Sequence, residues 1–377
     1  MSPIERLRVW RVAVPLIRPF ITAVRRADAI DVVLVEATDA DGRSGWGEAA
    51  VSWRVTGESP AGVAAVVTGP LADAVIGQDP VDPMTAAALA GSVWGNAAAR
   101  SAVECALADL TCRQRGTRLG EVFAPDAVTR IRTDMTLSAA APEELAERAR
   151  EHVAAGFASL KVKVSAVTDL SASIAAVRGA VGGGIELRAD ANQAWDADTA
   201  IRSIRACEEA GLELAFVEQP VAADDLDGLA RVTAAVSTPV MADESARTTR
   251  DVQEIVRRSA ADLVNIKLAK SGGLAEASSA ARTAQQAGLG VVFGCMMEGH
   301  VGVAATASLA AAFAPRTVHD LDAAAWLKRS PVSGGIRYDG EQILLPAGAG
   351  IGVERIAADA DAELLAERSR RMNGAAA

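Results

Sequence analysis

The first part of the chain combines strand-like and helix-like patterns of apolar residues. Residues 4–14 and 30–37 alternate in polarity or are rich in β-branched side chains, which predicts two strands. Asp41-Gly42 is typical of a hairpin turn and precedes a glycine-rich return, SGWGEAA. Beyond this return the pattern becomes alanine-rich and helical. These features predict an α+β unit, to which we assign residues 1–125.

A different rhythm follows, in which short apolar strands alternate with amphipathic helical segments. Eight strands are expected, at residues 131–137, 159–164, 185–190, 214–218, 239–243, 262–267, 290–295 and 317–322. Their starts are 23 to 29 residues apart, and each of the first seven precedes a helical pattern. Successive βα units of this kind predict a (β/α)8 barrel over residues 126–324. A doubly wound open sheet is the alternative, but no glycine-rich phosphate loop opens the first βα turn.

The tail, residues 325–377, shows strand and turn signals instead of an eighth helix. Its central part reads GGIRYDGEQILLPAGAGIGVE, in which glycines punctuate short apolar runs. We expect this tail to return to the first unit.

The charge of the chain limits its partners. Lysine and arginine number 38 and aspartate and glutamate 48, which gives a net charge of −10. This acidic excess argues against binding to nucleic acids or to an anionic membrane, since both need clustered positive charge. The longest apolar stretch, residues 301–314, is shorter than the ~20 residues of a membrane span, and the N-terminus does not resemble a signal peptide. The expected location is the cytoplasm.

Strand 159–164 presents two lysines on one face. With the period of two of a β-strand, Lys161 and Lys163 share one side and the three apolar residues share the other. The apolar side should pack on the helices, so the lysines should point into the barrel. A solvated edge strand is the alternative, but a closed barrel has no edges.

Three acids, Asp190, Glu218 and Asp243, end three consecutive strands. A single acid of this kind is more often a helix N-cap or a surface carboxylate. Adjacent strands are about 4.8 Å apart, so three acids at one depth should converge, and their mutual repulsion requires a cation. An all-oxygen ligand set favours Mg²⁺, and we expect one ion per subunit.

The sixth and eighth strands add polar ends across the barrel. Lys267 ends the sixth strand, which is diametrically opposed to the second, so Lys163 and Lys267 should face each other across the site. Asp320 and Asp322 on strand eight share parity and should lie opposite the metal, without a third partner. They suggest a site for an ammonium group, and a loop capping box is the alternative.

This arrangement predicts proton transfer beside a carboxylate. Two amines that flank a metal-held molecule can remove a proton from one face and return it to the other. The α-proton is weakly acidic, and Mg²⁺ on the neighbouring carboxylate would stabilise the enediolate. A lysine must be neutral to act as a base, and Lys161 together with the metal should lower the pKa of Lys163. Lys161 should stay cationic and bind the carboxylate.

The strand ends form a set of motifs that resembles the enolase superfamily, muconate-lactonizing subgroup, over essentially the whole chain. The motifs are Lys161-Val-Lys163, Asp190-Ala-Asn192, Val217-Glu218-Gln219-Pro220, Ala242-Asp243-Glu244-Ser245 and Asn265-Ile-Lys267. The resemblance implies a (β/α)8-type (TIM) barrel, modified as (β/α)7β, with an α+β capping domain. It also implies that the three acids bind Mg²⁺, that Lys163 and Lys267 are the acid/base catalysts, and that the subunits form homo-oligomers.

Asp320-Leu321-Asp322 is similar to the Asp-x-Asp signature of dipeptide epimerases, whose two aspartates hold the free α-ammonium of the substrate. The resemblance thus implies an isomerase that inverts the α-carbon of the C-terminal residue of a dipeptide. N-acylamino acid racemase, o-succinylbenzoate synthase and muconate cycloisomerase of the same subgroup are the alternatives, but their substrates lack an ammonium. A non-catalytic barrel that binds a metal or a carboxylate ligand is disfavoured by the retention of both lysines and all three acids.

Further residues are implied in substrate binding by resemblance. Thr22-Ala23-Val24-Arg25 is similar to a loop of L-Ala-D/L-Glu epimerases in which the arginine meets the glutamate side chain, and Arg26 is the alternative. This loop implies Ala-Glu-like substrates. Thr136 matches another substrate-contacting position, and the segment that contains Glu298 should line the pocket.

Overall fold

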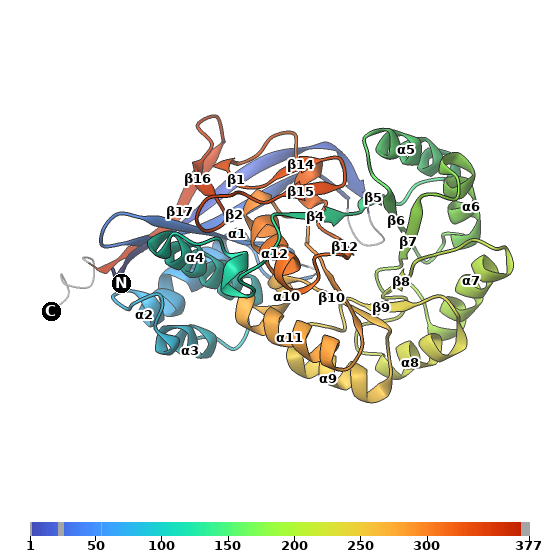
Figure 1. The fold of residues 1–377 in the computed structure, drawn as a ribbon, viewed down its shortest axis with the longest axis horizontal. Helices are drawn as coiled ribbons and strands as arrows, with labels where there is room; N and C mark the ends of the chain where they lie inside the picture. The colour runs from blue at the N-terminus through green and yellow to red at the C-terminus, as the bar shows by residue number, and fades with distance from the viewer. Residues whose placement is uncertain (1, 22–25, 54, 371–377) are drawn as a thin grey trace.

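The computed structural model describes residues 2–21, 26–53 and 55–370 of the chain. The described chain is elongated, with sheet and helices of a cap at one end and barrel helices at the other (Figure 1). The first strand, β1 (Ile4–Ile21), pairs with the last, β17 (Ala362–Ser369), so both ends of the chain meet in the sheet of the cap.

The barrel is based on a sheet of seven parallel strands in the order β11-β10-β9-β8-β7-β6-β5. These strands are β5 (Met135–Leu137), β6 (Ser159–Lys163), β7 (Glu186–Asp190), β8 (Val217–Glu218), β9 (Val240–Ala242), β10 (Leu263–Ile266) and β11 (Gly290–Phe293). The eighth strand, β12 (Val318–His319), runs parallel to β4 (Arg130–Thr133), and Asp320 just beyond it bridges to Gly294 just beyond β11. The predicted α/β barrel is confirmed.

The first predicted barrel strand, residues 131–137, is divided at Asp134. Before the break, β4 pairs with β12 and with β15 (Gln342–Leu344), whereas after it β5 pairs with β6. The amide of Asp134 donates to the carbonyl of His319 at 2.9 Å, and its carboxylate accepts from Arg188 at 3.0 Å. The apolar pattern predicted one strand because it does not show that the pairing partners change at Asp134.

Helices follow the strands β5 to β11 and pack outside the barrel (Figure 1). They are α5 (Pro142–Ala154), α6 (Leu170–Val181), α7 (Ala197–Glu209), α8 (Leu226–Ala235), α9 (Thr249–Arg258), the short α10 (Leu268–Ser271), α11 (Leu274–Gln286) and α12 (His300–Phe313). Aspartates determine where three of them begin: Asp169, Asp196 and Asp225 accept hydrogen bonds from first-turn amides of α6, α7 and α8.

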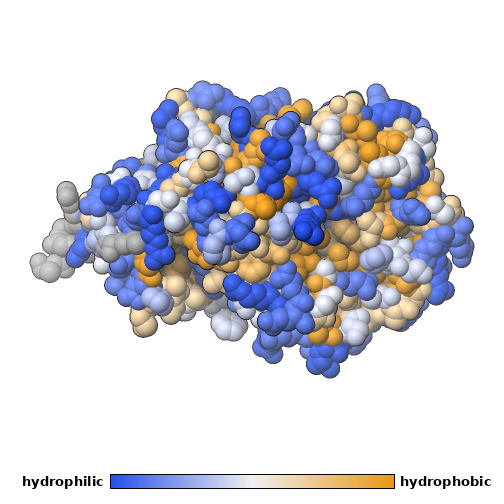
Figure 2. All heavy atoms as spheres, viewed as in Figure 1, coloured by the Kyte–Doolittle hydropathy of each residue, from blue (hydrophilic) through white to orange (hydrophobic). Residues whose placement is uncertain are grey.

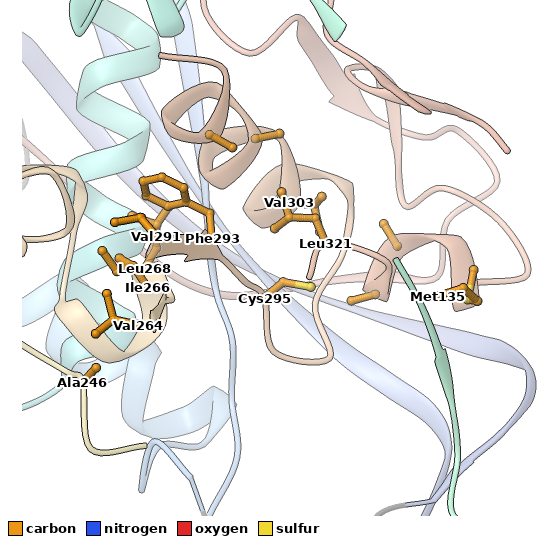
Figure 3. Packing of buried hydrophobic residues seen from close by; sticks show 14 of the residues in the cluster. Met135, Ala246, Val264, Ile266, Leu268, Val291, Phe293, Cys295, Val303 and Leu321 are labelled. Atoms are coloured by element: carbon orange, nitrogen blue, oxygen red, sulfur yellow. The ribbon is translucent and has the colours of Figure 1, made fainter. Parts of the chain in front are cut away.

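The apolar stretch that includes residues 301–311 is a buried part of α12. Figure 3 shows apolar side chains of β10 and β11 packed together, with the loop that contains Cys295 extending from β11. In the described part of the chain, no helix has the length and apolarity needed to cross a bilayer. Hydrophilic side chains cover much of the face seen in Figure 2, with smaller hydrophobic areas between them.

The cap combines a sheet with helices from the first part of the chain. Its other strands are β2 (Arg26–Asp39) and β3 (Ser44–Ala49), and its helical segments are α1 (Pro60–Val66), η1 (Val67–Leu71), α2 (Ala72–Val75), α3 (Pro83–Gly91), α4 (Ala97–Arg115) and η2 (Gly120–Val122). A Cβ on Gly45 or Gly47 would lie 2.2 or 1.9 Å from a backbone oxygen of α4. The glycines of the SGWGEAA return therefore allow β3 to pack closely against this helix.

The C-terminal tail contacts both parts of the molecule. A 3-10 turn, η3 (Ala323–Trp326), stands where an eighth helix is missing, as predicted. The strands that follow are β13 (Val332–Gly334), β14 (Arg337–Asp339), β15 and β16 (Val353–Ile356). Of these, β15 pairs with β4 of the barrel. The last strand of the tail, β17, pairs with β1 of the cap.

Candidate active site

A cavity of about 520 Å³ lies at the carboxyl ends of the barrel strands, where polar side chains converge. The barrel contributes Thr136, Lys161, Lys163, Asn192, Gln193, Asp243, Glu244, Arg247, Lys267, Cys295, Met296, Met297, Asp320, Asp322 and Ala323 to its wall. The cap contributes Phe20 from β1 and Val51, Ser52 and Val55 from the segment after β3. This volume and mixed polarity suit a small-molecule ligand.

Strand β6 orients both of its lysines toward this cavity, as the alternation of its residues predicted. The apolar residues between and beside them have no exposed surface. The ammonium of Lys161 lies 2.5 Å from Asp320 and 3.3 Å from Glu218. Burial lowers the pKa of Lys161, but Asp320 and Glu218 more than offset burial, so this pKa lies well above its ordinary value. Lys161 is therefore cationic.

The three acids predicted to bind metal are buried at neighbouring strand ends. Asp190 and Glu218 are directly opposite each other in the β7–β8 register, and both have no exposed surface. Each acid is paired with a lysine: Asp190 with Lys163 in a short contact, Glu218 with Lys161 at 3.3 Å and Asp243 with Lys267 at 2.8 Å. The ammonium groups thus compensate the acids' negative charges in the described state.

The pKa values of Glu218 and Asp243 are shifted in opposite directions. Burial and the neighbouring charge of Asp190 raise the pKa of Glu218 well above its ordinary value. Burial also opposes ionisation of Asp243, but Lys267 and Lys270 outweigh it and lower the pKa of this acid. Lys267 likewise keeps a raised pKa against the cost of its burial, because Asp243 and other acids surround it.

The donor atoms at these strand ends fit a hard divalent cation. All three acids offer carboxylate oxygens, the ligands that Mg²⁺ prefers. Beside them, Oδ1 of Asn192 and Oε2 of Glu244 are buried without a hydrogen-bond partner in the described part of the chain. Buried polar atoms of this kind are normally satisfied, so they are consistent with a further group or water at this place.

Lys267 and Lys163 reach the cavity from separated strands. Lys163 belongs to β6 and Lys267 directly follows β10, and the strands β7, β8 and β9 lie between them. Both side chains line the cavity. That the two amines approach one ligand from different sides stays a prediction.

Both Asp320 and Asp322 differ from their expected environment, because each has hydrogen-bond partners in the structure. We expected both acids to lie opposite the metal set without another partner. In the structure, Nδ2 of Asn265 donates to Glu218 at 2.8 Å and to Asp320 at 3.0 Å, and Lys161 is also paired with Asp320. The long side chain of Lys161 reaches across the narrow interior to Asp320, and strand order alone does not reveal this contact. Burial opposes ionisation of Asp320, but the lysines, Lys161 foremost, lower its pKa.

A third acid, Asp134, joins Asp320 and Asp322 and was missed in the sequence. Carboxylate oxygens of these three residues lie within 4.8 Å of one another, a spacing that the predicted metal set does not meet within the described chain. Burial raises the pKa of Asp134 to about 7, against the lowering effect of Arg188. The only sequence signal was its spacing of two residues from Thr136, which places both side chains on one face of an ideal strand.

The other predicted substrate-binding residues have different placements. Thr136 lines the cavity, and its backbone amide donates to Asp322 at 2.7 Å. Glu298 is buried but is not among the cavity-lining residues, and its carboxylate accepts from the amide of Met296 at 2.9 Å. Arg25 lies outside the described residues.

Glu48, from the glycine-rich return of the cap, binds the barrel loop that contains Glu298. Its two carboxylate oxygens accept from the amides of Gly299 at 2.5 Å and Gly302 at 2.9 Å, at the N-terminus of α12. Burial raises the pKa of Glu48 to about 7 and, together with the charge of Glu48, that of Glu298 to about 8. The cap thereby holds the cavity loop that includes Met296 and Met297.

Comparisons with known proteins identify the family to which this fold belongs. Residues 5–123 match the N-terminal domain of mandelate racemase and muconate lactonizing enzyme, and residues 144–359 match the enolase C-terminal domain-like family. The L-Ala-D/L-Glu epimerase of Bacillus subtilis is 38% identical over 93% of this chain and 96% of its own. The N-succinyl-L-Arg/Lys racemase of Bacillus cereus is 30% identical over 93% of this chain and 95% of its own.

Solved structures show the same relationship. A substrate-liganded complex of the Bacillus subtilis epimerase has a TM-score of 0.91 at 37% identity, covering 94% of this chain and 99% of that one. The dipeptide epimerase of Enterococcus faecalis, complexed with Mg and L-Leu-L-Tyr, has a TM-score of 0.89 at 34% identity, covering 94% and 100%.

Barrel, cap and strand-end residues together define an isomerase of the epimerase and racemase class. The chain belongs to the enolase superfamily, with both domains of the mandelate racemase and muconate lactonizing group. Within it, the chain is a dipeptide epimerase-like enzyme.

Proposed function

We propose that this protein is a Mg²⁺-dependent dipeptide epimerase that inverts the α-carbon of the C-terminal residue. The observation that supports this most directly is one cavity lined by Lys163 and Lys267 from separated strands and by Asp320 and Asp322, which follow β12. The lysines can serve two faces of one carbon, and the aspartates can bind a cationic group of the same ligand. A dipeptide offers both an acidic α-carbon beside a carboxylate and a free ammonium.

Two lysines perform the proton transfer in this proposal. One neutral lysine removes the α-proton, and the opposite lysine, as an ammonium, donates a proton to the other face of the resulting enediolate. The reverse reaction exchanges their roles. Lys161 remains cationic and binds the substrate carboxylate, whose negative charge increases as the α-proton leaves.

Asp190, Glu218 and Asp243 are the residues that would hold Mg²⁺. The bound ion would supply positive charge that stabilises the enediolate. The all-carboxylate set and the unpaired oxygens of Asn192 and Glu244 support this assignment. The alternative acid cluster around Asp134 is better explained as a site for an ammonium group, because Arg188 already pairs with Asp134 at 3.0 Å.

Deuterium exchange tests the proposed reaction. The purified enzyme with Mg²⁺ in deuterated buffer should incorporate one deuterium at the α-carbon of the C-terminal residue of accepted dipeptides, with formation of the second epimer. Mass spectrometry over a library of L,L-dipeptides and their N-acyl counterparts measures this. Replacing Asp320 and Asp322 together with asparagine should abolish exchange of dipeptides. Persistent activity of this variant, or exchange of the N-acyl compounds alone, would favour an N-acylamino acid racemase.

We further propose that the C-terminal residue is acidic, as in Ala-Glu. Arg25, to which this preference was assigned, lies outside the described residues, but Arg247 also lines the cavity. It is exposed, and no described acid lies within ion-pair distance of it, whereas the three cavity lysines are all paired with acids. It lies between β9 and α9, in the same connection as Asp243.

Replacing Arg247 with alanine is expected to lower kcat/KM for Ala-Glu about tenfold, because a charge-assisted contact is lost. Activity on Ala-Gln should change little. The ratio of the two rates, measured by the exchange assay, gives the effect of charge directly. Arg250, an exposed arginine of α9 that does not line the cavity, provides the matched control. An equal loss on both substrates would contradict a role in recognising an acidic side chain.

A further inference from the structure

The carboxylate of Asp322 is held on one side only. Its Oδ2 atom accepts two hydrogen bonds, from Nε1 of Trp326 at 3.0 Å and from the amide of Thr136 at 2.7 Å. In the described part of the chain no residue donates to Oδ1, and the side chain lines the cavity. Two donors on one oxygen fix the orientation of the carboxylate and leave the other oxygen for a ligand.

Trp326 also contacts the cap. Its ring meets that of Phe20 edge to face, with 5.1 Å between centroids and an interplanar angle of 87°. Phe20 belongs to β1 and lines the cavity from the cap side. Next to this pair, Leu16 of the cap forms a β-bridge with Leu327. One side chain thus touches both the acid of the barrel and the strand that closes the cavity.

The sequence around Trp326 explains why an indole can make both contacts. Asp322 immediately precedes η3, and Trp326 is its last residue, so the turn brings the two side chains together four positions apart. A second cavity of about 250 Å³ borders Trp326 on another side, together with Met135 and Tyr338. The hydrogen bond to Asp322 and the contact with Phe20 fix the ring on the sides away from this cavity.

We infer that Trp326 is a positioning residue, which orients Asp322 toward the ammonium of the substrate and couples this orientation to the seating of the cap strand on the barrel. The inference rests on the proposed function, because it assumes that Asp322 receives an ammonium. It assigns Trp326 no contact with the substrate. Trp326 acts through the free oxygen of Asp322. Loss of the indole N–H should therefore weaken binding of the N-terminal residue of the substrate and leave the proton transfer unchanged.

Replacing Trp326 with phenylalanine tests this role, because the variant keeps a ring against Phe20 and removes the N–H donor. We expect KM for Ala-Glu to rise about tenfold, the ratio equivalent to ~1.4 kcal/mol, with kcat nearly unchanged. Propionyl-glutamate, in which a hydrogen replaces the amino group, should inhibit the variant and the wild type equally. Trp46→Phe is the control, since Trp46 is buried in the cap and its Nε1 has no partner in the described chain.

The coupling to the cap has its own measurement. Phe20→Leu alone should also raise KM, and in the Trp326→Phe background its effect should be smaller than in the wild type, because the two residues act on the same acid. If the wild type catalyses exchange, an unchanged KM for Ala-Glu in Trp326→Phe would overturn the inference. Inhibition by propionyl-glutamate that weakens in this variant as much as Ala-Glu binding does would also overturn it. Absence of exchange in the wild type would contradict the proposed function and, with it, the role of Trp326.

Discussion

Replacing Lys163 or Lys267 with alanine is expected to lower the rate of epimerisation at least about 1,000-fold, the contribution typical of a positioned acid or base. Inversion requires a proton to leave one face of the α-carbon and another to arrive on the opposite face. Each single variant keeps one of the two groups and cannot complete the inversion. The measurement is formation of the second epimer of an accepted dipeptide, followed by chiral chromatography.

Exchange without inversion distinguishes a catalytic loss from a folding defect. The variant that retains Lys267 should still exchange the α-proton of the epimer whose C–H bond faces this lysine, and the Lys163-containing variant should do so with the other epimer. Lys328 is exposed and distant in sequence from both, so Lys328→Ala is the control and should retain full activity. Equal exchange of both epimers by one single variant would contradict the two-base mechanism.

Local pattern predicted the parts of the barrel that depend on alternation. The period of two in β6 placed Lys161 and Lys163 on the inner face, and the structure shows both lining the cavity. The amphipathic patterns likewise predicted a helix after each of the first seven strands. These features depend on neighbours a few residues away, so one sequence contains enough information to predict them.

Contacts between distant strands were not predictable in this way. The predicted strand 131–137 is divided at Asp134 because β4 pairs with β12 and β15, which come from the far end of the chain, whereas β5 pairs with β6. The pairing of Asp320 with Lys161 depends on the long lysine side chain reaching across the barrel interior. Glu298 was expected in the pocket wall, but Glu48 of the cap binds the same loop and the acid stays buried beside it. Each outcome is set by tertiary packing.

Lysine usage is a signal that the pattern of strands does not include. The chain has 38 basic residues, of which five are lysines, and four of these five are buried around the same acids: Lys161, Lys163, Lys267 and Lys270. Arginine cannot lose its proton in a protein, whereas a lysine can act as an acid or a base. A chain that otherwise uses arginine therefore places its titratable amines where proton transfer would need them.

Substitutions of single acids can test which of the two acid clusters binds the metal ion. Chelation should abolish activity and Mg²⁺ should restore it, because the charge that builds on the substrate carboxylate would otherwise be uncompensated. Glu218→Gln should lower activity about 1,000-fold, a loss consistent with several kcal/mol of transition-state stabilisation by a metal. Glu218 has no exposed surface and lies next to Asp190, so the variant removes a proposed ligand with little change in shape.

Metal binding itself gives the decisive comparison, since it does not depend on turnover. Mn²⁺ titration followed by electron paramagnetic resonance should show weaker binding by Glu218→Gln and wild-type affinity in Asp134→Asn. Asp134 is equally buried and also carries a carboxylate, but it belongs to the cluster with Asp320 and Asp322. Weaker Mn²⁺ binding by Asp134→Asn, with unchanged binding by Glu218→Gln, would place the cation at that cluster and remove the basis for assigning an ammonium to it.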